Sequence, residues 1–131
     1  GVVVNVTSTV TLMPLLLLSI YTASKAAVNA FTECLALELA PFNVRASIVL
    51  PGYAPDTKFG DNARALMLGV PTPYEEMARA VFTRFEEFSG PSTKATDVAE
   101  AVWTAVNDPE ANYLPAGADA VLLADSRRTG H

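Results

Sequence analysis

Two side chains near residue 20 could exchange a proton with a bound molecule. Tyr21 and Lys25 are four residues apart, so on a helix they lie on one face, one turn apart. A free phenol has a pKa of about 10, too high for efficient proton exchange near neutrality, and a nearby ammonium group lowers it by favouring the phenolate. The pair therefore predicts a tyrosine general acid or base tuned by a lysine.

A hydroxyl group precedes this pair in the chain. Ser8 comes thirteen residues before Tyr21 and follows a β-branched run, so we expect it at the carboxyl end of a strand, where open parallel sheets bind ligands. There it could donate a hydrogen bond to a carbonyl oxygen as charge develops. Without this context, the Tyr–Lys spacing also fits an ordinary helix with a solvated lysine beside a packed tyrosine. Thr7 is expected to be a structural hydroxyl.

Other reactive side chains are scarce. Cys34 is the single cysteine and lies in an apolar stretch, so we expect a packed thiol and no internal disulfide. His131 is the single histidine, and no metal site is predicted. A serine hydrolase using Ser8 would need a positioned histidine base, for which the last residue is a poor candidate.

The hydrophobic pattern predicts the elements that position these groups. Residues 2–6 indicate a parallel strand buried on both faces, and residues 7–19 a loop. Residues 20–40 contain no Gly or Pro and predict a helix buried nearly all round. A second strand is expected at residues 44–50. Strand, helix and strand with short connections predict a right-handed βαβ unit in a parallel sheet.

Weaker signals follow the second strand. Residues 51–71 read as an irregular segment with a short helix near residues 62–68. Thr72 to Glu75 predict a helix start, with Thr as the cap, Pro at the first helical position and Glu closing a capping box. The remaining expected elements are a helix from Thr96-Asp97 to Asp108, a short strand at 113–114 and a final helix over 118–125.

The order and spacing of the motifs resemble the short-chain dehydrogenase/reductase family. The motifs are Asn5-Val6-Thr7-Ser8, Tyr21-Thr22-Ala23-Ser24-Lys25-Ala26-Ala27, Asn43-Val44-Arg45 and Pro51-Gly52. The resemblance is close up to about residue 57 and loose beyond it. It implies an α/β fold, a partial Rossmann-like, doubly wound parallel sheet of about three strands with flanking helices. Residues 1–131 would be the C-terminal half of that domain.

The resemblance implies a catalytic role for three residues of the first two motifs. Tyr21 would protonate the substrate oxygen during reduction, or deprotonate the alcohol during oxidation. Lys25 would lower the pKa of Tyr21 and hydrogen-bond the nicotinamide ribose of NAD or NADP. Ser8 would orient and polarise the carbonyl group, whose carbon receives the hydride.

The resemblance also implies cofactor contacts after the second strand. The backbone after Pro51 and Gly52 would lie near the nicotinamide. Thr57 would contact the carboxamide or a phosphate of the cofactor, although a plain turn threonine fits its position equally well. The preference for NAD or NADP and the direction of the reaction stay open.

The substrate implied is a small-molecule ketone or alcohol, and a compound with an apolar body is favoured. An apolar pocket is suggested by a set of large side chains together with the loop at residues 12–18: Met67, Met77, Phe82, Phe85 and Phe88. The alternative is that these residues simply pack a helix against the sheet.

The family's glycine-rich cofactor turn has no counterpart among these 131 residues. We therefore expect the N-terminal cofactor-binding half to be absent and the fragment alone to be inactive. The apolar surface which that half would cover predicts a homo-oligomer or a longer polypeptide. A non-catalytic binding or regulatory module is the alternative function. Loss of Ser8, Tyr21 or Lys25 would indicate it, and all three are present.

Composition excludes several other classes. The net charge is −5, which argues against a nucleic-acid partner because phosphate binding needs clustered Lys and Arg. The longest aliphatic run, residues 15–18, is too short to span a bilayer, so no membrane partner is predicted. A cytoplasmic protein with one domain and a core of its own is expected.

Overall fold

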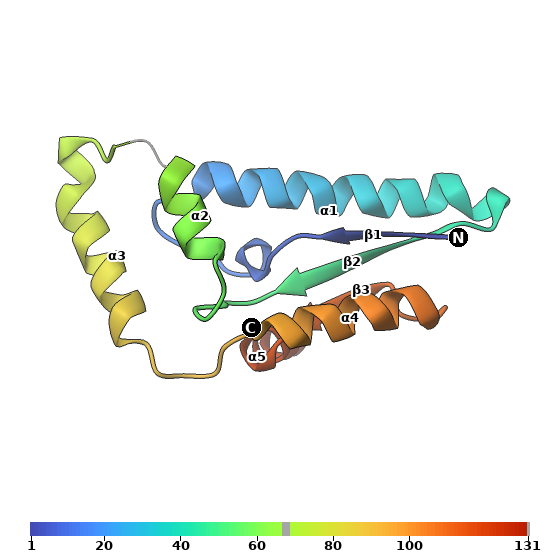
Figure 1. Cartoon of the computed structure of the whole chain (residues 1–131). Coiled ribbons are helices and arrows are strands. Elements are labelled where there is room, and N and C mark those ends of the chain that lie inside the picture. Colours follow the sequence, from blue (N-terminus) through green and yellow to red (C-terminus); the bar gives the residue numbers. More distant parts are fainter. Residues whose placement is uncertain (67–68, 131) are drawn as a thin grey trace.

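The structure is a computed structural model that describes residues 1–66 and 69–130 (Figure 1). Its strands are β1 (Val2–Val6), β2 (Arg45–Pro51) and β3 (Tyr113–Ala116). Its α-helices are α1 (Ser19–Leu39), α2 (Phe59–Leu66), α3 (Glu75–Glu87), α4 (Ala95–Asn107) and α5 (Ala118–Arg128). Short 3-10 helices lie in the connections: η1 (Thr9–Thr11), η2 (Ala40–Phe42) and η3 (Thr72–Tyr74).

The strands form one parallel sheet in the order β1-β2-β3. In the pairing of β1 with β2, Val6 lies beside Val49, and in that of β2 with β3, Pro51 lies beside Ala116. The expected βαβ unit and partial Rossmann-like sheet are confirmed. Because the strands are parallel, their carboxyl ends share one edge, and α2 and α3 lie beyond it (Figure 1).

The core lies around β2, the central strand. Residues 46–50 are all buried, and Val49 and Leu50 have no exposed surface. Helices α1 and α4 cover opposite sides of the sheet (Figure 1). On the α4 side Val49 packs with Ala101 and Ala105, whose small side chains let the helix approach the sheet closely. The central strand β2 is therefore held in the core over most of its length.

A tight reversal links α1 to β2. Pro41 lies in η2 directly after α1, where it cannot continue the α-helical hydrogen bonding. Asn43 then adopts the left-handed conformation with φ 56°, which asparagine tolerates better than most residues. The chain can thus turn back into β2 within a few residues.

The burial expected for the first helix and strand is wrong for this chain. Of α1 only Thr32 is buried, whereas Ile20 is 84% and Leu37 is 78% exposed. Cys34 is also exposed rather than packed. β1 pairs with β2 alone among the described residues, so Val3 and other side chains stay partly exposed. In the described part of the chain the sheet covers only one side of α1, so the side chains on the other side of the helix stay exposed.

The third helix begins differently from the expected capping box. Thr72 and Pro73 lie in η3, and α3 begins at Glu75 after Tyr74, which makes no side-chain capping bond. Figure 1 shows α3 standing apart from the sheet, joined to it through α2 and the segment before α4. None of the helices in residues 1–66 and 69–130 is long and apolar enough to cross a bilayer.

Candidate active site

Ser8 lies just past the carboxyl end of β1. Its backbone is extended, and its side chain caps η1 by accepting a hydrogen bond from the Val10 amide at 3.2 Å. This cap fixes the direction in which the chain leaves the strand. The expected strand-end position of Ser8 is therefore observed, and its Oγ is held at the edge where parallel sheets bind ligands.

Tyr21 and Lys25 lie on the first two turns of α1, and α1 begins at the end of the molecule where the strands end (Figure 1). The Tyr21 phenol is hydrogen-bonded to the Ser8 hydroxyl. The Lys25 ammonium nitrogen lies over the Tyr21 ring, 5.5 Å from its centroid, in the range of a cation–π contact. The structure thus brings together the hydroxyl, phenol and ammonium groups singled out in the sequence.

The pKa of Tyr21 differs from the sequence-based expectation. Burial raises the pKa of this phenol above its ordinary value of 10.0, and the hydrogen bond with Ser8 offsets part of the rise. We expected Lys25 to lower the pKa, but burial of the half-buried phenol outweighs the groups that favour the phenolate. Near neutrality Tyr21 is therefore protonated, which is the form that donates a proton.

Two polar residues missed in the sequence support Ser8. The Thr11 hydroxyl donates to the Ser8 carbonyl oxygen at 2.9 Å and accepts from Asn29 Nδ2 at 3.1 Å. Asn29 lies one turn after Lys25 on α1, so Tyr21, Lys25 and Asn29 share a helix face. Asn29 Oδ1 is buried without a partner among the described residues. The four-residue spacing was the available signal for Asn29; Thr11 had none.

The loop after β2 lies at the same edge. Pro51 is the last residue of β2, and the Gly52 amide donates to Thr93 Oγ1 at 3.0 Å. Thr57 is used within its own turn, where its hydroxyl donates to the Ala54 carbonyl oxygen at 2.9 Å and accepts from the Phe59 amide at 3.3 Å. The plain turn role of Thr57 is thus seen, and its cofactor contact stays a prediction.

Aromatic rings gather beyond the sheet edge. The ring centroid of Tyr53 lies 5.1 Å from that of Phe85 and 5.6 Å from that of Phe88. The ring of Phe59, on α2, lies 6.3 Å from that of Tyr21. These contacts join the loop after β2 to α3, and α2 to the candidate acid. Three more residues were expected to line an apolar pocket. Of these, Met77 and Phe82 are partly exposed, and Met67 lies outside the described residues.

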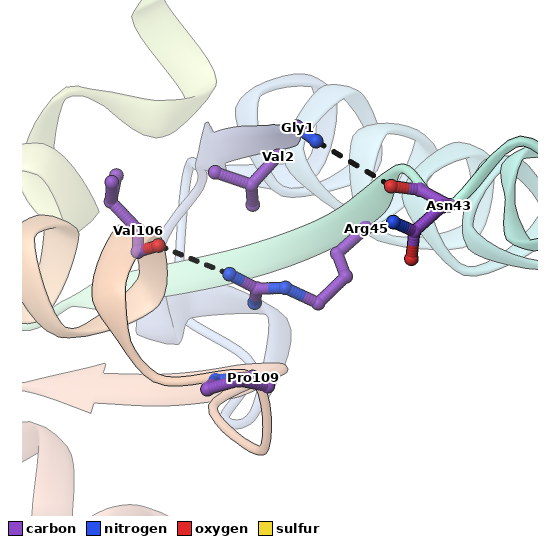
Figure 2. Close-up of a pocket in the computed structure, with 6 residues that line it drawn as sticks. All are labelled: Gly1, Val2, Asn43, Arg45, Val106 and Pro109. Atoms are coloured by element: carbon purple, nitrogen blue, oxygen red, sulfur yellow. Dashed lines mark hydrogen bonds between the residues drawn. The ribbon is translucent and has the colours of Figure 1, made fainter.

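A hollow of about 440 Å³ lies at the opposite end of the strands, beside Gly1, Val2, Asn43, Arg45, Val106 and Pro109 (Figure 2). The Arg45 guanidinium there donates to the carbonyl oxygens of Ala105, Val106 and Asp108 at 3.1 to 3.2 Å. These acceptors end α4, whose last carbonyls have no partner within the helix. Arg45 is therefore a structural cap, and this hollow lies away from Ser8 and Tyr21.

Acidic and thiol side chains do not gather into a metal centre in the part of the chain that the structure describes, where no group of three His, Cys, Asp or Glu could hold an ion. The side chains that do gather at the site carry hydroxyl, phenol and ammonium groups. Such a set can hold an oxygen atom and exchange a proton with it.

Comparison with known proteins agrees with this chemistry. The family model of the short chain dehydrogenases matches residues 1–66, the part that contains Ser8, Tyr21 and Lys25. A 2,3-dihydro-2,3-dihydroxybenzoate dehydrogenase of Bacillus subtilis is 46% identical over 52 residues, which is 40% of this chain and 20% of that enzyme.

Solved structures match over nearly the whole chain. A short chain dehydrogenase from Burkholderia cenocepacia in complex with NADP superposes with a TM-score of 0.69 and 28% identity, covering 99% of this chain and 44% of its own. A short chain dehydrogenase/reductase from Burkholderia phymatum in complex with NAD gives 0.68 and 28%, covering 97% and 46%. The chain thus spans less than half the length of these relatives.

Proposed function

The chain belongs to the short-chain dehydrogenase family, and on that premise we propose that it supplies the proton-transfer half of an NAD(P)-dependent oxidoreductase. The reaction is hydride transfer between a nicotinamide cofactor and a ketone or alcohol. The observation that carries the proposal is the meeting of Ser8, Tyr21 and Lys25 at the carboxyl ends of the strands. Relatives crystallised with NADP and NAD support the cofactor class.

Ser8 and Tyr21 both act on the substrate oxygen in this proposal. Ser8 donates a hydrogen bond to the substrate oxygen, which the fixed direction of the chain after β1 supports. Tyr21 donates its proton to the same oxygen when the carbonyl is reduced, and its raised pKa keeps that proton available near neutrality. In the reverse direction the Tyr21 phenolate accepts the alcohol proton, so oxidation requires more alkaline conditions.

The residues present suit part of a dinucleotide. Lys25 forms no ion pair within the described part of the chain, so its ammonium is available to a ribose hydroxyl. A nicotinamide cofactor held there would supply or accept the hydride. The loop at Pro51 and Gly52 borders the same edge through backbone groups. None of the glycines has the spacing of a pyrophosphate-binding turn.

We therefore propose that this chain is the C-terminal half of a longer domain. Within residues 1–66 and 69–130, β1 is paired on one side only. Its other side and the exposed outer face of α1, with Ile20 and Leu37, are the surfaces that the rest of the domain and a second copy would cover. Substrate contacts are assigned to the aromatic rings of Phe59, Phe85 and Phe88, which favours a carbonyl compound with an apolar body.

The experiment that tests the function is an assay of the intact protein. NADH or NADPH oxidation is followed by absorbance with a panel of apolar ketones, and the reverse reaction with the matching alcohols. We expect carbonyl-dependent oxidation of at least one cofactor. Cofactor binding without turnover of any carbonyl compound would favour the non-catalytic alternative instead.

A further inference from the structure

A partly buried polar cluster ties three distant segments together at the carboxyl edge of the sheet. Asp119, in the first turn of α5, uses both carboxylate oxygens. Oδ2 accepts a hydrogen bond from the Tyr53 amide at 2.7 Å, and Oδ1 lies 2.7 Å from Thr93 Oγ1. The residues joined are 66 and 26 positions apart in the chain. One carboxylate thus holds the loop after β2 and the segment before α4.

Thr93 also binds the loop after β2, and we call the contacts of Asp119 and Thr93 with Gly52 and Tyr53 the clamp. Thr93 is 1% exposed, its amide donates to the Tyr53 carbonyl oxygen at 2.7 Å, and its Oγ1 accepts from the Gly52 amide at 3.0 Å. The same oxygen lies 2.9 Å from the Ala116 carbonyl oxygen. Both peptide groups that follow Pro51 are therefore fixed by side chains from outside the loop.

The two glycines of the cluster are explained by this close approach. A Cβ on Gly52 would collide with the carboxylate of Asp119, and a Cβ on Gly117 would collide with Thr93. Gly117 also has φ 114°, a conformation that other residues rarely adopt. Gly52 is thus a glycine because Asp119 occupies the space beside it.

We propose that Asp119 and Thr93 are positioning residues, and that their clamp on Gly52 and Tyr53 sets where the cofactor and substrate are held. The clamp acts in two directions. It fixes the backbone after Pro51, which the proposed function places beside the nicotinamide. It also fixes Tyr53, whose ring contacts Phe85 of α3 and Phe88, the residue directly after that helix. The inference rests on the proposed function for its catalytic consequence, whereas the clamp itself can be measured without turnover.

The test is a double-mutant cycle in the intact protein, with Gly52→Ala, Asp119→Ala and the double variant. Asp119→Ala is expected to raise the cofactor KM about tenfold, the effect of one lost charge-assisted hydrogen bond, with a much smaller change in kcat. Gly52→Ala alone is expected to raise the cofactor KM further, because its methyl group displaces the carboxylate. The double variant should have a cofactor KM no higher than that of Asp119→Ala. Independent, multiplying effects of the two substitutions would overturn the proposal.

Milder variants at Thr93 separate positioning from stability. Thr93→Ser keeps the hydroxyl and should retain the wild-type KM, whereas Thr93→Val removes it and should raise the KM. A lowered Tm in Thr93→Val or Asp119→Asn with an unchanged KM would show a purely structural cluster and would overturn the assignment.

Amide hydrogen exchange keeps this test separate from the proposed function. The Tyr53 amide should lose protection in Asp119→Ala, and the double variant should lose no more. Unchanged protection would overturn the clamp even in an active enzyme. If the wild-type protein turned over no carbonyl compound, the proposed function would fail, while the exchange pattern would still decide the clamp.

Discussion

The Lys25 ammonium nitrogen lies over the ring of Tyr21, 5.5 Å from its centroid, while the phenol at the other end of that ring is hydrogen-bonded to Ser8. Tyr21 is therefore held by a cation on its ring face and by a hydroxyl at its oxygen. The phenol oxygen is the atom that would exchange the proton. We therefore expect the pH dependence of kcat to respond to the loss of the Ser8 hydrogen bond.

Carbonyl reduction by the intact protein should hold its rate from neutral pH to about pH 10, the ordinary pKa of a phenol. The sign follows from burial, which raises the pKa of Tyr21, so the proton donor is lost only as pH rises through that raised value. Ser8→Ala removes the hydrogen bond that lowers this pKa and should move the alkaline limb to higher pH. A pH profile of kcat for both proteins measures this. An alkaline limb below pH 9, or one that Ser8→Ala moves to lower pH, would contradict the account.

Thr11→Val should lower kcat by up to about a hundredfold, because a reacting group displaced by about 1 Å can lose that much. The substitution removes the hydroxyl that donates to the Ser8 carbonyl oxygen and accepts from Asn29. Thr11→Ser keeps both bonds and is the matched control. Steady-state kinetics of the pair measure the effect. Equal rates for the Val and Ser variants would remove Thr11 and Asn29 from the support of the site.

Arg45→Met should destabilise the protein without affecting catalysis. The guanidinium donates to three carbonyl oxygens at the end of α4 (Figure 2 draws the bond to Val106). Losing such bonds costs about 1–3 kcal/mol of unfolding free energy. Urea denaturation measures the cost, and kcat should stay at the wild-type value because Arg45 lies at the amino ends of the strands. A fall in kcat at unchanged stability would contradict this.

The 131-residue chain by itself should bind NADP no more tightly than about 1 mM. Its glycines do not form a pyrophosphate-binding turn, so only the nicotinamide ribose and the loop after Pro51 would contribute contacts. Isothermal titration calorimetry of the chain and of the intact protein makes the comparison. Micromolar binding by the chain alone would show that its cofactor site is more complete than we propose.

Local patterns were sufficient to predict the elements that carry the site. The apolar β-branched run predicted β1 with the observed bounds, and the stretch without Gly or Pro predicted α1 to within one residue at each end. Ser8, Tyr21 and Lys25 could be found because each lies at the start or end of such an element. Their mutual approach then follows from the βαβ connection.

Contacts between distant segments could not be predicted. Asp119 and Thr93 meet Tyr53 only because β2, β3 and α5 converge at one edge, and no short-range spacing marks them. Burial of α1 was overestimated for a related reason: hydropathy shows that Ile20 and Leu37 suit an interior, but not whether this chain provides the covering surface. The raised pKa of Tyr21 likewise depends on burial, which the spacing to Lys25 does not reveal.

The most direct test of the central claim is Tyr21→Phe in the intact protein, with kcat for carbonyl reduction and the Kd for the cofactor measured side by side. The substitution removes only the phenolic oxygen and leaves the ring beneath Lys25. We predict a loss in kcat of about 10²- to 10⁴-fold, the range of general acid catalysis, with little change in cofactor Kd. A kcat within a few fold of the wild-type value would show that Tyr21 is not the proton donor.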